Sequence, residues 1–359
     1  MIKQGGTQMK KWLPFLIITF IFALVLTACG GGSNEEESDT NEEETETSEG
    51  TDEATEEAES GESYVIGATH IVEHPSIDRA YEGFQAAISD AGLDVEYDFQ
   101  SAQNDPNNVK PISDGFVADG VDLIFANSTP SALGAAEATS DIPIVFTSVT
   151  DAVDAGLVPS MDEPGENITG VLDLHPDAIS ETVNFIDTYY PDATVGLIYN
   201  AGEPNSVTQI EAVQEAVEGT SLSIQERTVA NGSEVQQAAT TLVSDIDVFY
   251  IITDNTVVEA LDSVISVAND QDIPLVVGEP DSVAKGGFAT FGIDYYTIGY
   301  RTGEMAVEIL TGEKTTQDIP VEYPPEIQLF INKEAAEEQA VEWQDEWDEE
   351  AQFVETEEE

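Results

Sequence analysis

The chain has 359 residues, of which 73 are acidic and 10 are basic, giving a formal net charge of −63. Such a charge repels nucleic acids and anionic lipid surfaces, so neither is expected as a partner. Because the acidic residues are spread along the whole chain and repel one another, they indicate a surface adapted to salt, where ions screen the repulsion. A surface that captures a cationic ligand is the alternative interpretation.

The N-terminal segment has the pattern of a bacterial lipoprotein signal. Two lysines precede an apolar run from Trp12 to Leu26, and a Leu-Thr-Ala-Cys motif ends at Cys29. The run is shorter than the roughly 20 residues that span a bilayer, as is typical of a secretory signal peptide. Cys29 is the only cysteine, so it has no partner for a disulfide or for a cysteine metal site. We expect residues 1–28 to be removed and Cys29 to carry a lipid such as palmitate. The protein would then work outside the cytoplasm, anchored to the cell membrane; an uncleaved anchor would also place it outside.

Two acidic segments flank the middle of the chain. Residues 29–63 contain almost no large apolar side chains after Cys29, so we expect a disordered, extended spacer. Residues 347–359 are also acidic, and we expect them to form a tail outside the fold. About 280 residues remain between these segments, which is enough for two lobes with separate cores.

From Tyr64 onward, short apolar strands alternate with helical patterns, which predicts parallel sheets covered by helices on both faces. A helix is expected from Pro75 to about Gly92, and another after Asp105, which would cap it. The predicted strands are 64–68, 95–99, 123–126, 144–146, 195–199, 248–252 and 275–277.

An internal repeat sharpens this α/β assignment. Residues 121–125 (VDLIF) reappear as 246–250 (IDVFY), and 141–145 (DIPIV) reappear as 272–276 (DIPLV). Two copies predict two similar Rossmann-like lobes joined by a hinge. We place the first lobe at 64–172 plus about 292–320, and the second at 173–291 plus about 321–346.

Ligands of open α/β sheets bind beyond the carboxyl ends of the strands. In the first lobe these ends carry hydroxyls, which together with helix N-terminal amides suit a carboxylate. In the second lobe they carry acids, which suit an ammonium. The residues are Ser128, Thr129, Thr147 and Ser148 in the first lobe, and Asp254 and Glu279 in the second. Facing each other across a cleft, they would hold a zwitterion such as an amino acid. Helix capping and, for Glu279, a solvated loop are the alternatives for these residues.

The segment from His70 to His74 reads H-x-x-E-H, the inverted zincin motif. A zinc site needs both histidines on one helical face and a third ligand. Because His70 directly follows a strand and Pro75 follows His74, we expect a strand-to-helix loop and no metal. The sequence contains no G-x-S-x-G and no P-loop motif.

Six segments of the chain, taken together, resemble those of a known protein family. They are 66–67 (IG), 70–75 (HIVEHP), 141–147 (DIPIVFT), 199–206 (YNAGEPNS), 253–256 (TDNT) and 292–296 (GIDYY). Together they resemble the tryptophan/tyrosine-type ABC transporter substrate-binding proteins, over residues 64 to 343. The resemblance implies a type I periplasmic-binding fold whose lobes are joined by three crossings. It also implies that a small ligand, often an aromatic amino acid, is delivered to a membrane permease powered by a cytoplasmic ATPase.

Carried over by position, the resemblance implies a role for each candidate residue. The four hydroxyl residues of the first lobe would take the ligand carboxylate, and Asp254 with Glu279 would take the ammonium. The walls of the cleft would come from the loop Thr69–His74, including Thr69, Glu73 and His74, and from Asn200, Glu203, Asn205 and Ser206.

The resulting prediction is a monomeric, lipid-anchored solute-binding protein that is not an enzyme and needs no cofactor. Its lobes would close around the ligand by a hinge movement. Three alternatives remain open from the sequence. The same fold could serve as a ligand sensor for a membrane receptor, or it could bind a sugar or a nucleoside. An extracellular zinc hydrolase that uses His70 and His74 is the remote alternative.

Overall fold

The computed structural model describes residues 63–357. The expected signal peptide, the lipid-modified Cys29 and the spacer up to residue 62 lie outside the described residues. Within the described part, no helix is both long and apolar enough to cross a membrane.

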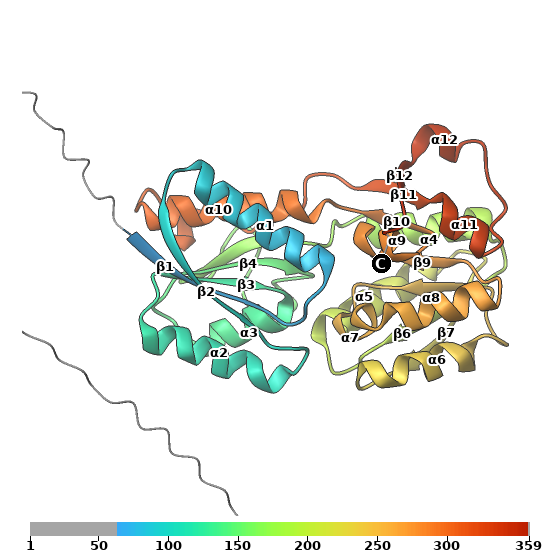
Figure 1. Ribbon diagram of the computed structural model, residues 1–359, viewed down its shortest axis with the longest axis horizontal. Helices are drawn as coiled ribbons and strands as arrows, with labels where there is room; N and C mark the ends of the chain where they lie inside the picture. Colours follow the sequence, from blue (N-terminus) through green and yellow to red (C-terminus); the bar gives the residue numbers. More distant parts are fainter. Residues whose placement is uncertain (1–62, 358–359) are drawn as a thin grey trace, which may run out of the picture. The chain divides into compact units, whose positions relative to one another are not determined.

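The first lobe is built on a five-stranded parallel sheet with the strand order β2-β1-β3-β4-β5 (Figure 1). Its strands are β1 (Ser63–His70), β2 (Asp94–Ser101), β3 (Leu123–Asn127), β4 (Ile144–Val149) and β5 (Ile168–Leu172). Its helical segments are α1 (Pro75–Asp90), α2 (Pro106–Asp119), α3 (Thr129–Ala138), α10 (Tyr295–Leu310) and η2 (Thr316–Asp318). As predicted, Asp105 caps α2: its side chain accepts a hydrogen bond from the amide of Asn107 at 2.9 Å.

The second lobe repeats this order in β7-β6-β8-β9-β10 and extends it by β11 and β12. Its strands are β6 (Thr194–Tyr199), β7 (Ser223–Thr228), β8 (Val248–Ile251), β9 (Leu275–Val277), β10 (Ala289–Gly292), β11 (Gln328–Asn332) and β12 (Gln352–Val354). Its main helices are α4 (Ala178–Tyr189), α5 (Pro204–Val217), α6 (Val235–Leu242), α7 (Asn255–Glu259), α8 (Leu261–Asp270) and α9 (Pro280–Lys285). Three shorter helical segments are η1 (Gly232–Glu234), directly before α6, and α11 (Lys333–Glu338) and α12 (Trp347–Glu350) near the C-terminal end. The predicted duplication is therefore present, because β3-β4 and β8-β9 hold the same places in their sheets.

Each sheet has an apolar core on both faces, as expected for strands buried on two sides. In the first lobe, α1 and α10 cover one face around Phe84, and α2 and α3 cover the other around Phe116. In the second lobe, α4 and α5 cover one face around Phe185, and α6 and α8 cover the other around Leu261.

Three segments cross between the lobes, at residues 173–177, 293–294 and 323–327. The first lobe extends further than predicted, because Val321 belongs to its core and Glu322 bridges to Val171. The third crossing therefore follows Glu322 rather than residue 320.

The segment from residue 347 is not a tail outside the fold, and that prediction is wrong. Trp347 is buried among Phe185, Tyr189 and Phe288, and β12 pairs in parallel with β11. The acidic residues around Trp347 give the segment its polar composition, but one large aromatic side chain and a strand pairing bind it to the second lobe.

Helices α1 and α10 approach closely because glycines line their contact. A Cβ atom on Gly299 would overlap the carbonyl oxygen of Ala80, and one on Gly83 would overlap that of Tyr296. This contact fixes the start of α10, and with it the second crossing, against the first lobe (Figure 1).

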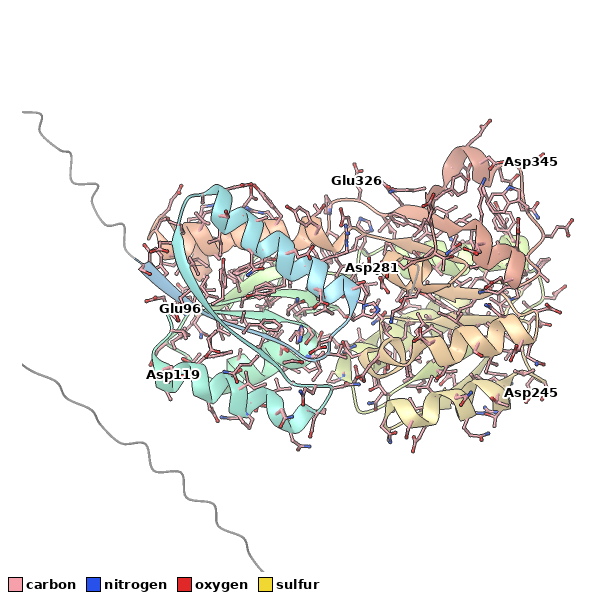
Figure 2. The ribbon with its side chains drawn as sticks, viewed as in Figure 1. Glu96, Asp119, Asp245, Asp281, Glu326 and Asp345 are labelled. Carbon is pink, nitrogen blue, oxygen red and sulfur yellow. The ribbon has the colours of Figure 1, made fainter. Side chains whose placement is uncertain are left out.

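Acidic side chains cover both lobes. Those labelled in Figure 2 lie on separate elements, from Glu96 on β2 and Asp119 at the end of α2 to Asp245 and Asp345 in the second lobe. The negative charge is thus distributed over the surface.

Candidate functional site

A cavity of about 30 Å³ lies between the lobes, where the carboxyl ends of the central strands meet. Six of the predicted site residues line it: His74, Thr129, Ser148, Asn205, Asp254 and Glu279. The strand ends that the repeat in the sequence singled out therefore lie close together in the structure.

The other predicted residues do not line this cavity. Thr69, Ser128, Thr147, Glu203 and Ser206 are buried near it, and Asn200 is half-buried. Glu73 is exposed to solvent, because it lies in the turn before α1 and faces away from the buried side chains of the loop.

Buried polar atoms without a hydrogen-bond partner gather around the cavity, in the part of the chain that the structure describes. Atoms of cavity-lining residues among them are Nε2 of His74, Oγ of Ser148, Oδ1 of Asp173 and Oδ1 of Asn205. Buried polar groups are normally paired, and each unpaired one costs free energy. The site therefore offers both donors and acceptors to a small polar molecule.

Asp254 holds the start of α7 and the end of β6 together. Its Oδ1 accepts from the amide of Val257 at 2.8 Å, and its Oδ2 accepts from the amide of Asn200 at 2.6 Å. Burial, and then the nearby Glu203, raises the pKa of Asp254 to about 7. Both carboxylate oxygens already accept backbone hydrogen bonds, so helix capping and a place in the cavity coexist in this residue.

Glu203 supports the same corner of the second lobe rather than the cavity itself. Its carboxylate accepts hydrogen bonds from the amides of Asn255 and Thr256 at 3.1 Å each, and from the Thr256 hydroxyl at 2.6 Å. It thereby fixes the first turn of α7, which carries Asn255 into the cavity wall.

Glu279 joins the two lobes. Its carboxylate caps α9 by accepting from the amides of Asp281 and Ser282, and it accepts a short hydrogen bond from the hydroxyl of Ser76 on α1. Nε2 of His74 lies 3.8 Å from Glu279. Burial lowers the pKa of His74 to about 3, so this histidine is neutral and the contact is not an ion pair.

Two serines at the site have positive φ angles, which non-glycine residues rarely adopt. They are Ser128, at φ 127°, and Ser148, at φ 55°. Strained backbone of this kind tends to concentrate at functional sites, because the surrounding structure holds it in place. Ser128 caps α3 directly after β3, whereas Ser148 lies within β4 where its register against β5 shifts, and only Ser148 lines the cavity.

Sequence reasoning missed Asp173 and Tyr295, which line the cavity from two of the crossings. The Tyr295 hydroxyl donates to Oδ2 of Asp173 at 3.0 Å. Neither residue belongs to the repeated strand ends, and Asp173 is one of many acidic residues in this chain.

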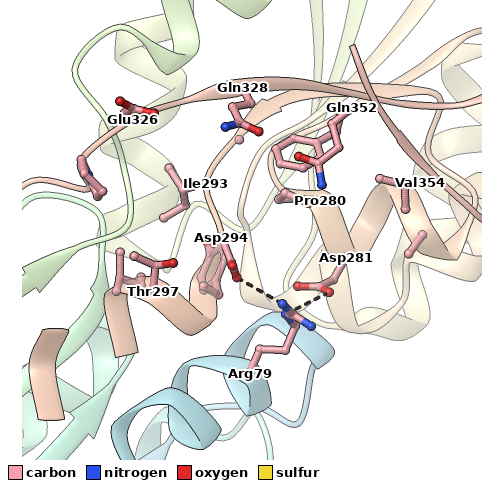
Figure 3. Close-up of a pocket in the computed structure, with 16 residues that line it drawn as sticks. Arg79, Pro280, Asp281, Ile293, Asp294, Thr297, Glu326, Gln328, Gln352 and Val354 are labelled. Carbon is pink, nitrogen blue, oxygen red and sulfur yellow. Dashed lines mark hydrogen bonds and ion pairs between the residues drawn. The ribbon is translucent and has the colours of Figure 1, made fainter. Parts of the chain in front are cut away.

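A larger cavity of about 450 Å³ lies beside the second and third crossings (Figure 3). There Arg79 on α1 pairs with Asp294 at 3.2 Å and lies 3.8 Å from Asp281. None of its lining residues carries an unpartnered buried polar atom. Its size alone therefore does not make it the better ligand site.

The H-x-x-E-H segment does not form a zinc site. His70 is the last residue of β1, whereas His74 caps α1 by accepting from the amide of Ser76 at 3.3 Å. The two histidines thus do not share a helical face, and Glu73 is exposed. Among residues 63–357, no group of three potential ligands is arranged to hold a metal ion.

In buffer alone, the protein is expected to lose stability as the pH rises from about 4 to about 6, because of Asp173. Burial raises the pKa of Asp173 to about 6, well above that of an unfolded aspartate. Between these values the unfolded chain has released a proton that the folded protein retains, so rising pH favours unfolding, and the effect levels off above pH 6. Asparagine cannot ionise, so the wild type should lose stability relative to Asp173→Asn between about pH 4 and about pH 6. Urea denaturation of both proteins measures this, and a pH-independent difference would contradict it.

A two-lobed α/β fold with a polar cavity between the lobes defines a solute-binding protein, and the comparisons agree. A structure from Streptococcus pneumonia, the ABC domain in complex with L-Trp, has a TM-score of 0.77 at 31% identity, covering 82% of this chain and 100% of that one. A ligand-free, open substrate-binding protein with adhesive properties from Clostridium difficile has a TM-score of 0.62 at 36% identity, covering 82% and 100%.

Sequence comparison identifies the family to which the chain belongs. The family model described as "ABC transporter substrate binding protein" matches residues 65–354. A protein named tyrosine-binding protein from Clostridioides difficile (strain R20291) is 38% identical over 330 residues, which is 90% of this chain and 91% of that protein. The chain belongs to the ABC transporter substrate-binding family. It is accordingly a binding protein rather than an enzyme, and it works outside the cytoplasm as this family does.

Proposed function

We propose that this protein binds an aromatic amino acid, such as tyrosine or tryptophan, in the interlobe cavity and delivers it to an ABC permease. The observation that carries the proposal is the group of unpartnered donors and acceptors buried in one cavity. A zwitterion satisfies both kinds of group at once, whereas a neutral sugar leaves a buried carboxylate without a counter-ion. The relatives named for tyrosine and bound to L-Trp support this ligand class.

Each side of the cavity takes one end of the amino acid in this proposal. The ligand carboxylate lies at the hydroxyl-bearing strand ends, against Thr129 and Ser148, with Ser128 and Thr147 behind them. The ammonium lies toward the acids of the cavity. Asn205 lines the opposite wall, and Asn200, Glu203 and Ser206 hold that wall in place.

Binding proceeds by hinge closure. The lobes are in direct contact through Ser76 with Asp281 at 2.7 Å, and through Asn104 with Glu259 at 2.6 Å. A cavity of about 30 Å³ is close to the volume of one water molecule, so an amino acid enters only when the lobes part. The higher TM-score with the L-Trp complex than with the open structure agrees with a closed arrangement. The permease would recognise the closed form of a monomer that is anchored by lipid on Cys29.

A thermal-shift screen tests the ligand class. Tyrosine, tryptophan or phenylalanine at about a hundred times the dissociation constant should stabilise the folded protein by roughly 2.7 kcal/mol, because they bind only that state. Alanine, galactose and adenosine serve as controls, for a zwitterion without the ring, for a sugar and for a nucleoside. Stabilisation by the sugar or the nucleoside alone would overturn the amino-acid assignment and leave the fold unaffected.

A further inference from the structure

Asp173 lies in the first crossing between the lobes, at the hinge, and not on the repeated strand ends of either lobe. It follows β5 directly, where the chain leaves the first lobe, and its backbone amide donates to the carbonyl of Val149 at 3.0 Å. Tyr295, which begins α10 at the second crossing, donates its hydroxyl to Oδ2 of Asp173. Since α10 is held against α1, the Asp173 carboxylate has a fixed position at the base of the cavity.

Asp173 differs from the other two acids that line the cavity. The carboxylate oxygens of Asp254 and Glu279 all accept hydrogen bonds from backbone amides. In contrast, Oδ1 of Asp173 is buried and accepts no hydrogen bond from another of the described residues. An unpaired buried carboxylate is costly, so this oxygen has the most to gain from a cation.

Among residues 63–357, no basic side chain forms an ion pair with the Asp173 carboxylate. The neighbouring Glu279 adds negative charge, and His74 is neutral. Arg79 on α1 is already paired with Asp281 and Asp294. A positive charge on the ligand would therefore meet Asp173 with little competition from the protein.

We propose that Asp173 binds the ammonium group of the amino acid, with Oδ1 of Asn205 as a second acceptor. This inference rests on the proposed function and changes the sequence prediction, in which Asp254 and Glu279 took that role. Asp254 then acts mainly by positioning α7 and the end of β6, while the hinge itself contacts the charged end of the ligand. When the lobes open, one lobe would move away from the ligand, while the ammonium group stays bound to Asp173 at the crossing.

Calorimetry with two ligands and two variants tests the proposal. The ligands are L-tyrosine and 3-(4-hydroxyphenyl)propanoate, which is tyrosine without its amino group. Asp173→Asn should weaken tyrosine binding at least about a hundredfold, while the affinity for the propanoate stays within about threefold. Asp177→Asn is the matched control, because it removes the same charge from an exposed side chain four residues further along; its affinity for tyrosine should match the wild type.

The outcomes separate the two proposals. If the wild type binds no aromatic amino acid, the proposed function fails. If it binds tyrosine and Asp173→Asn weakens both ligands equally, or neither, the ammonium assignment is overturned. If Asp173→Asn lost affinity for tyrosine but not for phenylalanine, Asp173 would contact the phenol group, and the ammonium assignment would again be overturned.

A second variant guards against misfolding. Tyr295→Phe keeps the carboxylate and removes only its hydrogen bond, and it should weaken tyrosine about tenfold with the propanoate unaffected. Because asparagine has the shape of aspartate and no charge to bury, Asp173→Asn should melt no lower than the wild type at neutral pH. Unchanged tyrosine affinity in both folded variants would refute the proposal.

Discussion

Replacing Trp347 by alanine is expected to lower the free energy of unfolding by about 3–5 kcal/mol, which is the usual cost of removing a buried aromatic side chain. Trp347 is 1% exposed and packs against Phe185, Tyr189 and Phe288 within the core of the second lobe. Its removal leaves a cavity beneath α4 and weakens the docking of β12 on β11. Urea denaturation, followed by tryptophan fluorescence and circular dichroism, measures the change.

Trp343 provides the matched control for this substitution. It meets the Trp347 ring edge-on at 5.3 Å but is only partly buried, and Lys333 lies over its ring. Trp343→Ala should therefore cost about 1 kcal/mol. Equal effects of the two substitutions would show that Trp347 is not the anchor of the C-terminal segment.

Replacing Gly299 by alanine is expected to destabilise the protein by about 3 kcal/mol, through overpacking rather than through a cavity. The added methyl group would overlap the backbone carbonyl of Ala80, which cannot move without shifting α1. Because α10 begins with Tyr295 at the cavity, the same substitution should also weaken amino-acid binding. Denaturation and calorimetry on one preparation give both numbers.

Gly115 offers the same chemical change without the clash. It lies in α2, and a Cβ atom there would meet nothing within 4 Å. Gly115→Ala should stabilise the protein by up to about 1 kcal/mol, because alanine favours the helix. If Gly299→Ala behaved like Gly115→Ala, the close contact between α1 and α10 would not be a constraint.

The duplicated lobes were predictable because buried parallel strands produce apolar runs that stand out in an acidic chain. The repeat of Asp-Ile-Pro before β4 and β9 also identified equivalent strands, and with them the strand ends that carry Thr129, Ser148, Asp254 and Glu279. The polar edge strand β7 gave no such signal, because its side chains alternate between solvent and protein.

The role of the hinge residues could not be predicted in the same way. Asp173 and Tyr295 are 122 residues apart in the sequence, and only the crossings bring them together. Nothing in the local pattern around Asp173 distinguishes it from the many other acids of this chain. The same holds for Trp347, whose acidic neighbours mask a contact that is made entirely by residues distant in the sequence.

The connectivity of the lobes has a practical consequence. The described chain enters the first lobe at Ser63 on β1 and ends its last strand at Val354 in the second lobe. A fluorescent donor fused near one of these points and an acceptor fused near the other would be attached to different lobes. Their energy transfer would then report any change in the distance between the lobes in real time, with no label inside the cleft.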